Sequence, residues 1–212
     1  EYAALLHDEG YDTVQLAVPK AITGVNGFDE ITPALLAEIN EEFAKQKVEI
    51  GIFSCYMDLS NPDSEVRRKA VETFCRGLSC AKEAGAKMAG TETSYEHLGP
   101  LEKQRRFPYM MDSLKRITEE AERLSVQIGL EPVAFHPLED METAVEVLDE
   151  IGSKRLQLIF DPANLLQRPE EVRQEAYWKR CLALGGERIA ALHIKDFRMT
   201  SEGERRGCAL GD

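Results

Sequence analysis

The sequence predicts an α/β protein, a (β/α)8 barrel whose first and last strands we expect to lie outside the 212 residues shown. Short apolar runs alternate along the chain with amphipathic segments of helical period, which requires parallel strands joined by right-handed crossovers. Acidic residues and a histidine follow several of these runs, where such a barrel gathers its functional side chains. The alternative architecture, a doubly wound sheet, usually carries a glycine-rich phosphate loop. The chain contains neither GxGxxG nor GxxxxGKS/T, which favours the barrel.

Six strands are expected, because six runs are too short for helices and too apolar for surface loops. The run from Leu156 to Phe160 shows this pattern most clearly. Asp161 follows where the strand leaves the core, and Pro162 cannot continue a strand ladder. The expected strands are residues 13–17, 48–54, 87–91, 127–131, 156–160 and 188–193.

A helix is expected after each strand except the last, and a helix that starts before residue 1 is expected to end at Gly10. Capping residues or prolines mark the starts of the others. The expected starts are Thr32–Pro33, Asn61–Pro62, about Pro108, Asp140 and Arg168–Pro169. The polar, glycine-containing segment 200–212 is expected to be a loop.

Composition narrows the class of protein to a single globular domain over residues 1–212, with 43% hydrophobic and 30% charged residues. The net charge of −12 argues against a nucleic-acid partner. No apolar run approaches the length of a membrane span, which argues against a membrane partner. The five cysteines form no CxxC pair, which favours a reduced, cytoplasmic protein.

Glu131, Asp161 and His193 come at or near the ends of three successive expected strands. Two carboxylates and an imidazole suit a divalent metal ion, with Mn²⁺ as the first expectation and Co²⁺, Zn²⁺ or Mg²⁺ as alternatives. A sugar that chelates such an ion through a carbonyl and the adjacent hydroxyl has an acidified C–H, and the ion stabilises the enediolate formed on its removal. Glu131 is the candidate for one of the two carboxylates that take and return the proton.

Five further residues are candidates for binding substrate, and each has an ordinary structural interpretation. Lys195 shares the inward face with His193 by strand alternation, but could instead pair with Asp196. Asn164 binds a substrate hydroxyl or forms an Asx-turn. His136 and Glu92 bind substrate or are loop residues, and Arg198 binds a phosphate or is solvated. The predicted substrate-binding set is Glu92, His136, Asn164, Lys195 and Arg198.

Four motifs resemble those of the sugar phosphate isomerase/epimerase family, the xylose isomerase-like TIM barrels. They are GTET at 90–93, GLEPV at 129–133, FDPAN at 160–164 and HIKDF at 193–197. The resemblance implies that Glu131, Asp161 and His193 bind the metal, and that a glutamate on the last strand, expected beyond residue 212, completes the site. It also implies a sugar or sugar-phosphate substrate and a homo-oligomer.

The resemblance leaves three functions open. The leading one is a metal-dependent sugar or sugar-phosphate isomerase or epimerase. The second is a dehydratase of the same superfamily, of the inosose or dehydroshikimate type, and the third is a non-catalytic sugar-binding barrel. Asn164 stands where ketose 3-epimerases of the family often have a histidine, which weakens the assignment to that subgroup. An endonuclease of the same superfamily would need more than the four histidines present.

Overall fold

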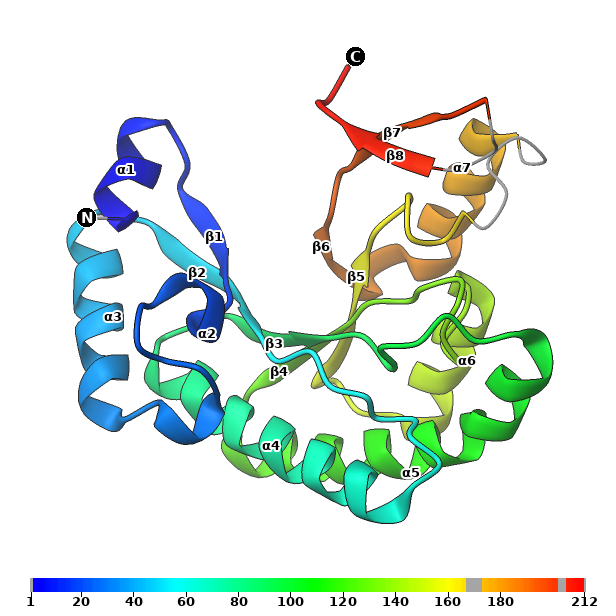
Figure 1. The fold of residues 1–212 in the computed structure, drawn as a ribbon, viewed down its shortest axis with the longest axis horizontal. Helices are drawn as coiled ribbons and strands as arrows, with labels where there is room; N and C mark the ends of the chain where they lie inside the picture. Colours follow the sequence, from blue (N-terminus) through cyan, green and yellow to red (C-terminus); the bar gives the residue numbers. More distant parts are fainter. Residues whose placement is uncertain (1, 167–172, 202–204, 212) are drawn as a thin grey trace.

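Six parallel strands form one curved sheet in which neighbours in the chain are neighbours in space (Figure 1). The structure, a computed structural model, describes residues 2–166, 173–201 and 205–211. The strands are Thr13–Leu16 (β1), Glu49–Ser54 (β2), Met88–Thr91 (β3), Gln127–Leu130 (β4), Leu156–Phe160 (β5) and Ile189–Leu192 (β6). All six predicted strands are confirmed, and their consecutive parallel pairing makes an incomplete α/β barrel.

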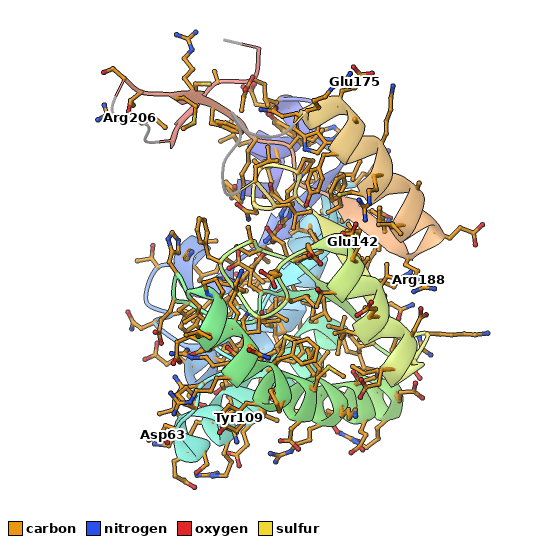
Figure 2. All side chains as sticks on the ribbon, turned by 90° about the vertical axis from the view of Figure 1, so that its right-hand side faces the viewer. Asp63, Tyr109, Glu142, Glu175, Arg188 and Arg206 are labelled. Carbon is orange, nitrogen blue, oxygen red and sulfur yellow. The ribbon has the colours of Figure 1, made fainter. Side chains whose placement is uncertain are left out.

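The helices α3 to α7 follow one another around the outside of this sheet (Figure 1). Their inner faces are buried against the strands, whereas charged side chains such as Glu175 lie on the outer side (Figure 2). The helices are Tyr2–Asp8 (α1), Val18–Ala21 (α2), Pro33–Lys45 (α3), Ser64–Glu83 (α4), Pro100–Leu124 (α5), Met141–Ile151 (α6) and Gln174–Gly185 (α7). Among the residues described, none of these helices has the length and apolarity needed to cross a bilayer.

Side-chain caps mark the starts of three of the described helices, α3, α4 and α6. Thr32 caps α3 and Asp140 caps α6, as predicted. The predicted start of α4 at Asn61 was wrong, because the Asp63 carboxylate accepts hydrogen bonds from two backbone N–H groups of the first turn. A carboxylate also interacts favourably with the positive end of the helix dipole. The predicted start of the last helix at Arg168–Pro169 lies outside the described residues.

The predicted start of α5 at about Pro108 was also wrong, because the helix begins at Pro100 and Pro108 lies inside it. Pro100 follows Gly99 at the first helical position, where the missing N–H costs nothing. A proline inside a helix removes one hydrogen bond, here to the carbonyl of Gln104. Pro108 and Gln104 are both exposed, so water can solvate the freed carbonyl.

The C-terminal segment is not the loop that was predicted. Asp196–Met199 (β7) and Arg205–Cys208 (β8) pair antiparallel as a separate two-stranded sheet. The Asp196 carboxylate accepts hydrogen bonds from the N–H groups of Phe197 and Gly211, at 2.8 and 3.0 Å. It thus joins the start of β7 to the segment that follows β8. Figure 2 places Arg206 of the hairpin at the opposite end of the molecule from Asp63 and Tyr109.

Apolar side chains pack on both faces of the curved sheet. The large cluster lies between the strands and the outer helices, and a small second cluster of Ile52, Met88 and Ile159 fills the inner face. Gly129 is needed beside this inner layer, because a Cβ there would lie 2.8 Å from Ile159 and 2.9 Å from Met88. The inner layer therefore packs closely at this level, and the next inward positions lie toward the carboxyl ends of the strands.

Polar residues occupy those next inward positions. Side chains alternate between the two faces of a strand, so the positions two residues beyond Gly129 and Ile159 also face inward. Those positions are Glu131 and Asp161. In the register of the sheet, Ile159 lies opposite Ala191, and the same alternation makes His193 an inward residue. The fold therefore brings polar groups from separate strands to one end of the sheet interior.

Candidate metal centre

Glu131, Asp161 and His193 converge at the carboxyl ends of β4, β5 and β6. One potential ligand atom from each residue lies within 4.8 Å of those of the other two. The backbone holds the first and third in place, since Glu131 N donates to Thr91 O and His193 N donates to Phe160 O, both at 2.9 Å. Glu131 is 2% exposed and Asp161 is fully buried. Two buried carboxylates this close together need positive charge between or beside them.

Hydrogen bonds from three sides hold the Glu131 carboxylate. Asn164 Nδ2 donates to Oε1 at 2.7 Å, and Tyr56 OH donates to Oε2 at 2.9 Å. His193 Nδ1 lies 3.2 Å from the same Oε2. Burial raises the pKa of Glu131, but the hydrogen bonds from His193 and Tyr56 outweigh it, so its pKa lies below the ordinary value. Glu131 is therefore a fixed and ionised carboxylate at neutral pH.

Asp161 is held by its own turn and by a lysine. Its Oδ1 accepts a hydrogen bond from Asn164 N at 3.1 Å, and its Oδ2 forms an ion pair with Lys195 Nζ. His193 Nδ1 is 3.9 Å from Oδ2. Hydrogen bonding to Glu131 raises the pKa of His193, with the charge of Asp161 acting in the same direction. In the metal-free protein, the positive charges of His193 and Lys195 thus balance the negative charges of the two carboxylates.

This donor set fits a divalent cation. It offers two carboxylates and one imidazole nitrogen, a combination that Mn²⁺, Co²⁺ and Zn²⁺ all accept. The two buried negative charges are arranged around one point, and a cation there would replace the balancing charges of His193 and Lys195. The ligand set was predicted from the sequence, and the structure brings its three members together; their role as metal ligands stays a prediction.

The predicted substrate-binding residues differ in how close they lie to the cluster. Asn164 and Lys195 contact the carboxylates of the cluster, as described above. Lys195 reaches Asp161 from the segment between β6 and β7. Arg198 lies on β7, exposed, and no hydrogen bond or ion pair joins it to the cluster among the described residues.

Glu92 and His136 lie together beside the cluster. His136 Nδ1 is 3.7 Å from Glu92 Oε2, beyond hydrogen-bond distance, and has no hydrogen-bond partner among the described residues. Burial lowers the pKa of His136 to about 4. Burial and the charge of Glu131 raise the pKa of Glu92 to about 7. The pair therefore holds a neutral imidazole next to a carboxyl group that can gain or lose a proton at neutral pH.

The raised pKa of Glu92 predicts a pH dependence of stability in the metal-free protein. Between pH 4.5 and about 7 the folded state keeps a proton that the unfolded chain has lost, so the free energy of unfolding falls as pH rises through this window. In the wild type we expect the free energy of unfolding to fall by on the order of 2 kcal/mol between pH 5 and pH 8, and Glu92→Gln should abolish this fall. Denaturant unfolding at the two pH values measures the difference. Glu146→Gln, at an exposed position of α6, is the control, and equal losses in wild type and Glu92→Gln contradict the prediction.

Sequence reasoning missed three polar residues of this region: Gln15, Ser54 and Tyr56. Gln15 Oε1 lies 2.6 Å from His193 Nε2, and Gln15 Nε2 donates to Ser54 Oγ at 2.9 Å and to Tyr56 OH at 3.1 Å. All three also line a pocket of about 590 Å³, a volume typical of small-molecule sites. The complete lining is Gln15, Ala17, Pro19, Lys20, Phe28, Ser54, Tyr56 and Glu92.

Comparison with known proteins agrees with this architecture. A family model described as xylose isomerase-like TIM barrel matches residues 3–212. None of the curated proteins compared with the chain matches it.

Three solved structures illustrate the fold similarity. A D-psicose 3-epimerase determined in the presence of D-fructose has a TM-score of 0.75 and 18% identity, over 96% of this chain and 70% of that one. The 3-keto-D-glucoside 4-epimerase of E. coli has a TM-score of 0.69 and 16% identity, over 92% and 72%. The IolI protein, determined with a zinc atom, has a TM-score of 0.71 and 18% identity, over 95% and 70%.

Proposed function

Since the chain belongs to the xylose isomerase-like TIM barrel family, we propose that it is a divalent-metal-dependent isomerase or epimerase of a sugar or sugar phosphate. The observation that carries the proposal is the convergence of Glu131, Asp161 and His193, whose ligand atoms lie within 4.8 Å of one another. These residues end three consecutive strands, which is where barrels of this kind carry out their chemistry.

Glu131, Asp161 and His193 would hold the metal, with Mn²⁺ preferred and Co²⁺, Zn²⁺ or Mg²⁺ as alternatives. A divalent cation at this position supplies Lewis acidity, which polarises a carbonyl group and acidifies the adjacent C–H. Lys195 would then be free to turn from Asp161 toward substrate, because its side chain is half exposed.

Glu131 is the proposed base. The bonds from Tyr56 and Asn164 keep its carboxylate ionised and fixed in orientation, and a base held in place accepts a proton without first losing a shell of water. Its position at the end of β4 faces the same interior as the neighbouring pocket. A proton taken from a substrate carbon beside this carboxylate would therefore move over a short, preset path.

The substrate would lie between the cluster and the pocket beside β1 and β2. Tyr56 and Glu92 line that pocket and offer hydrogen bonds to hydroxyl groups, while Asn164 and His136 lie on the side of β4 and β5. Arg198 on the hairpin would serve a phosphorylated end of the substrate. Two of the structurally similar proteins are named as a D-psicose 3-epimerase and a 3-keto-D-glucoside 4-epimerase, and we therefore choose ketoses as the first substrates to try.

The test is exchange of substrate hydrogen for deuterium. We expect the protein with Mn²⁺ in D₂O to catalyse exchange at the carbon next to the carbonyl of at least one ketose or ketose phosphate, followed by proton NMR. Removal of metal by a chelator should slow the exchange by about 100-fold or more, and restored Mn²⁺ should recover it. Exchange that is indifferent to the chelator, or its absence from every ketose tried, contradicts the proposal. Product spectra from the same samples separate epimerisation from dehydration, which loses water.

A further inference from the structure

We propose that Gln15 is a positioning residue that determines which nitrogen of His193 faces the metal. The inference rests on the proposed function, because it assigns a role to a residue that supports the same metal centre. It follows from a closed ring of contacts that joins Gln15, His193, Glu131 and Tyr56. Gln15 and His193 are separated by 178 positions in the chain, so only the fold brings them together.

His193 is held at both ring nitrogens. Its Nδ1 lies 3.2 Å from Glu131 Oε2, on the side of the cluster, and its Nε2 lies 2.6 Å from Gln15 Oε1. A histidine that binds a metal must present an unprotonated nitrogen to it, and the other nitrogen usually donates its hydrogen to an acceptor. Gln15 Oε1 is such an acceptor, provided that the amide group is oriented with its oxygen toward His193.

The orientation of the Gln15 amide follows from the other members of the ring. An ionised carboxylate only accepts hydrogen bonds, so Tyr56 must donate its hydroxyl hydrogen to Glu131 Oε2 at 2.9 Å. The Tyr56 oxygen is then an acceptor for Gln15 Nε2 at 3.1 Å, and Ser54 Oγ accepts from the same nitrogen at 2.9 Å. The NH₂ group of Gln15 therefore points toward β2, which leaves Oε1 facing His193.

Each link of the ring thus sets the next. The charge of Glu131 orients the Tyr56 hydroxyl, Tyr56 orients the Gln15 amide, and Gln15 accepts the hydrogen of His193 Nε2. In the metal-free protein His193 also carries a hydrogen on Nδ1, which faces Glu131 Oε2. Because Gln15 holds the Nε2 hydrogen, Nδ1 is the nitrogen that would give up its hydrogen and face a metal ion at the cluster. Without Gln15, the Nε2 hydrogen has no acceptor in the ring of contacts. A neutral His193 would then keep its one hydrogen on Nδ1, where Glu131 Oε2 accepts it and where it blocks the metal.

The ring also has a mechanical role. Gln15 lies on β1 and His193 follows β6, which are the two edge strands of the six-stranded sheet. Their contact fixes the orientation of the imidazole ring from the side opposite to the carboxylates. A side chain at position 15 that cannot accept a hydrogen bond should therefore affect both the protonated nitrogen and the freedom of the ring to rotate.

Zn²⁺ binding to Gln15→Met and Gln15→Glu tests the inference. Methionine has a similar length and no amide, whereas glutamate keeps an oxygen for the Nε2 hydrogen. We expect Gln15→Met to weaken Zn²⁺ binding by about 10-fold to 100-fold in calorimetry, the range for partners of metal ligands, and Gln15→Glu to restore most of it. In ¹⁵N-histidine-labelled protein with Zn²⁺, the His193 Nε2 hydrogen should be protected from exchange in the wild type and Gln15→Glu, and unprotected in Gln15→Met.

The outcomes separate this inference from the proposed function. Wild-type affinity in Gln15→Met, or a protected Nε2 hydrogen in that variant, overturns the role of Gln15 and leaves the proposed function standing. Zn²⁺ binding with the expected variant pattern, but no exchange with any ketose, supports the role of Gln15 and overturns the proposed function. A wild-type protein that binds none of Zn²⁺, Mn²⁺, Co²⁺ and Mg²⁺ overturns both.

Discussion

Glu131→Gln is expected to reduce deuterium exchange into the ketose substrate by about 1,000-fold or more, which lies within the usual contribution of a general base. Glutamine keeps the length of the side chain and can still accept the hydrogen bond from Asn164 Nδ2. It cannot take a proton from carbon, and it removes one negative charge from the proposed metal centre. Saturating Mn²⁺ compensates for part of the expected loss of metal affinity. The exchange rate measured by proton NMR under this condition therefore reports mainly the loss of the base.

The matched control is Glu146→Gln, the same substitution at an exposed position of α6, which should exchange like the wild type. Thermal unfolding of both variants shows whether the fold is retained, since Tyr56 OH must find a new partner when Oε2 becomes an amide nitrogen. Exchange within about threefold of wild type in a folded Glu131→Gln would remove Glu131 from the role of base.

The fold was predictable to the extent that buried strands and capped helices carry local signals. The strand from Leu156 to Phe160 could be recognised without knowledge of the strands beside it, because a parallel strand that is covered on both faces is predominantly apolar. The start of α5 was missed because Pro108 gives the same local signal as a proline at a helix start, and only its exposure allows it to lie inside the helix. The hairpin β7–β8 was missed because each strand has only four residues, and the β8 sequence RRGC shows no alternation of polar and apolar residues.

Part of the candidate site was predictable for a similar reason. Glu131, Asp161 and His193 interrupt apolar runs at the same point of three consecutive units, so parallel pairing alone brings them together. Gln15 and Ser54 gave no such signal, since a single glutamine or serine in a strand is common. Inward alternation would have found them: Gln15 lies opposite Ile52 in the register, and Ser54 lies two residues beyond Ile52 on the same face. The sequence could not show which polar atoms meet across the interior.

Asp161→Asn is expected to weaken Zn²⁺ or Mn²⁺ binding by at least about 100-fold, more than the loss of a residue that only supports a ligand. Asp161 is fully buried and supplies one of the two negative charges of the cluster. Asparagine keeps an oxygen that can accept the turn hydrogen bond from Asn164 N, so the backbone after β5 should keep its path. Calorimetric titration of the metal-free protein with either ion measures the change.

The same variant should leave the stability of the metal-free protein within about 1 kcal/mol of wild type. The substitution removes the ion pair with Lys195, but that side chain is 51% exposed and can return to water. It also removes one of two neighbouring buried carboxylates, which relieves repulsion with Glu131. With metal at 100 times its dissociation constant, the wild type should gain about 2.7 kcal/mol and Asp161→Asn much less. A variant that unfolds without metal would instead make Asp161 a structural residue, because stability and metal affinity would then be lost together.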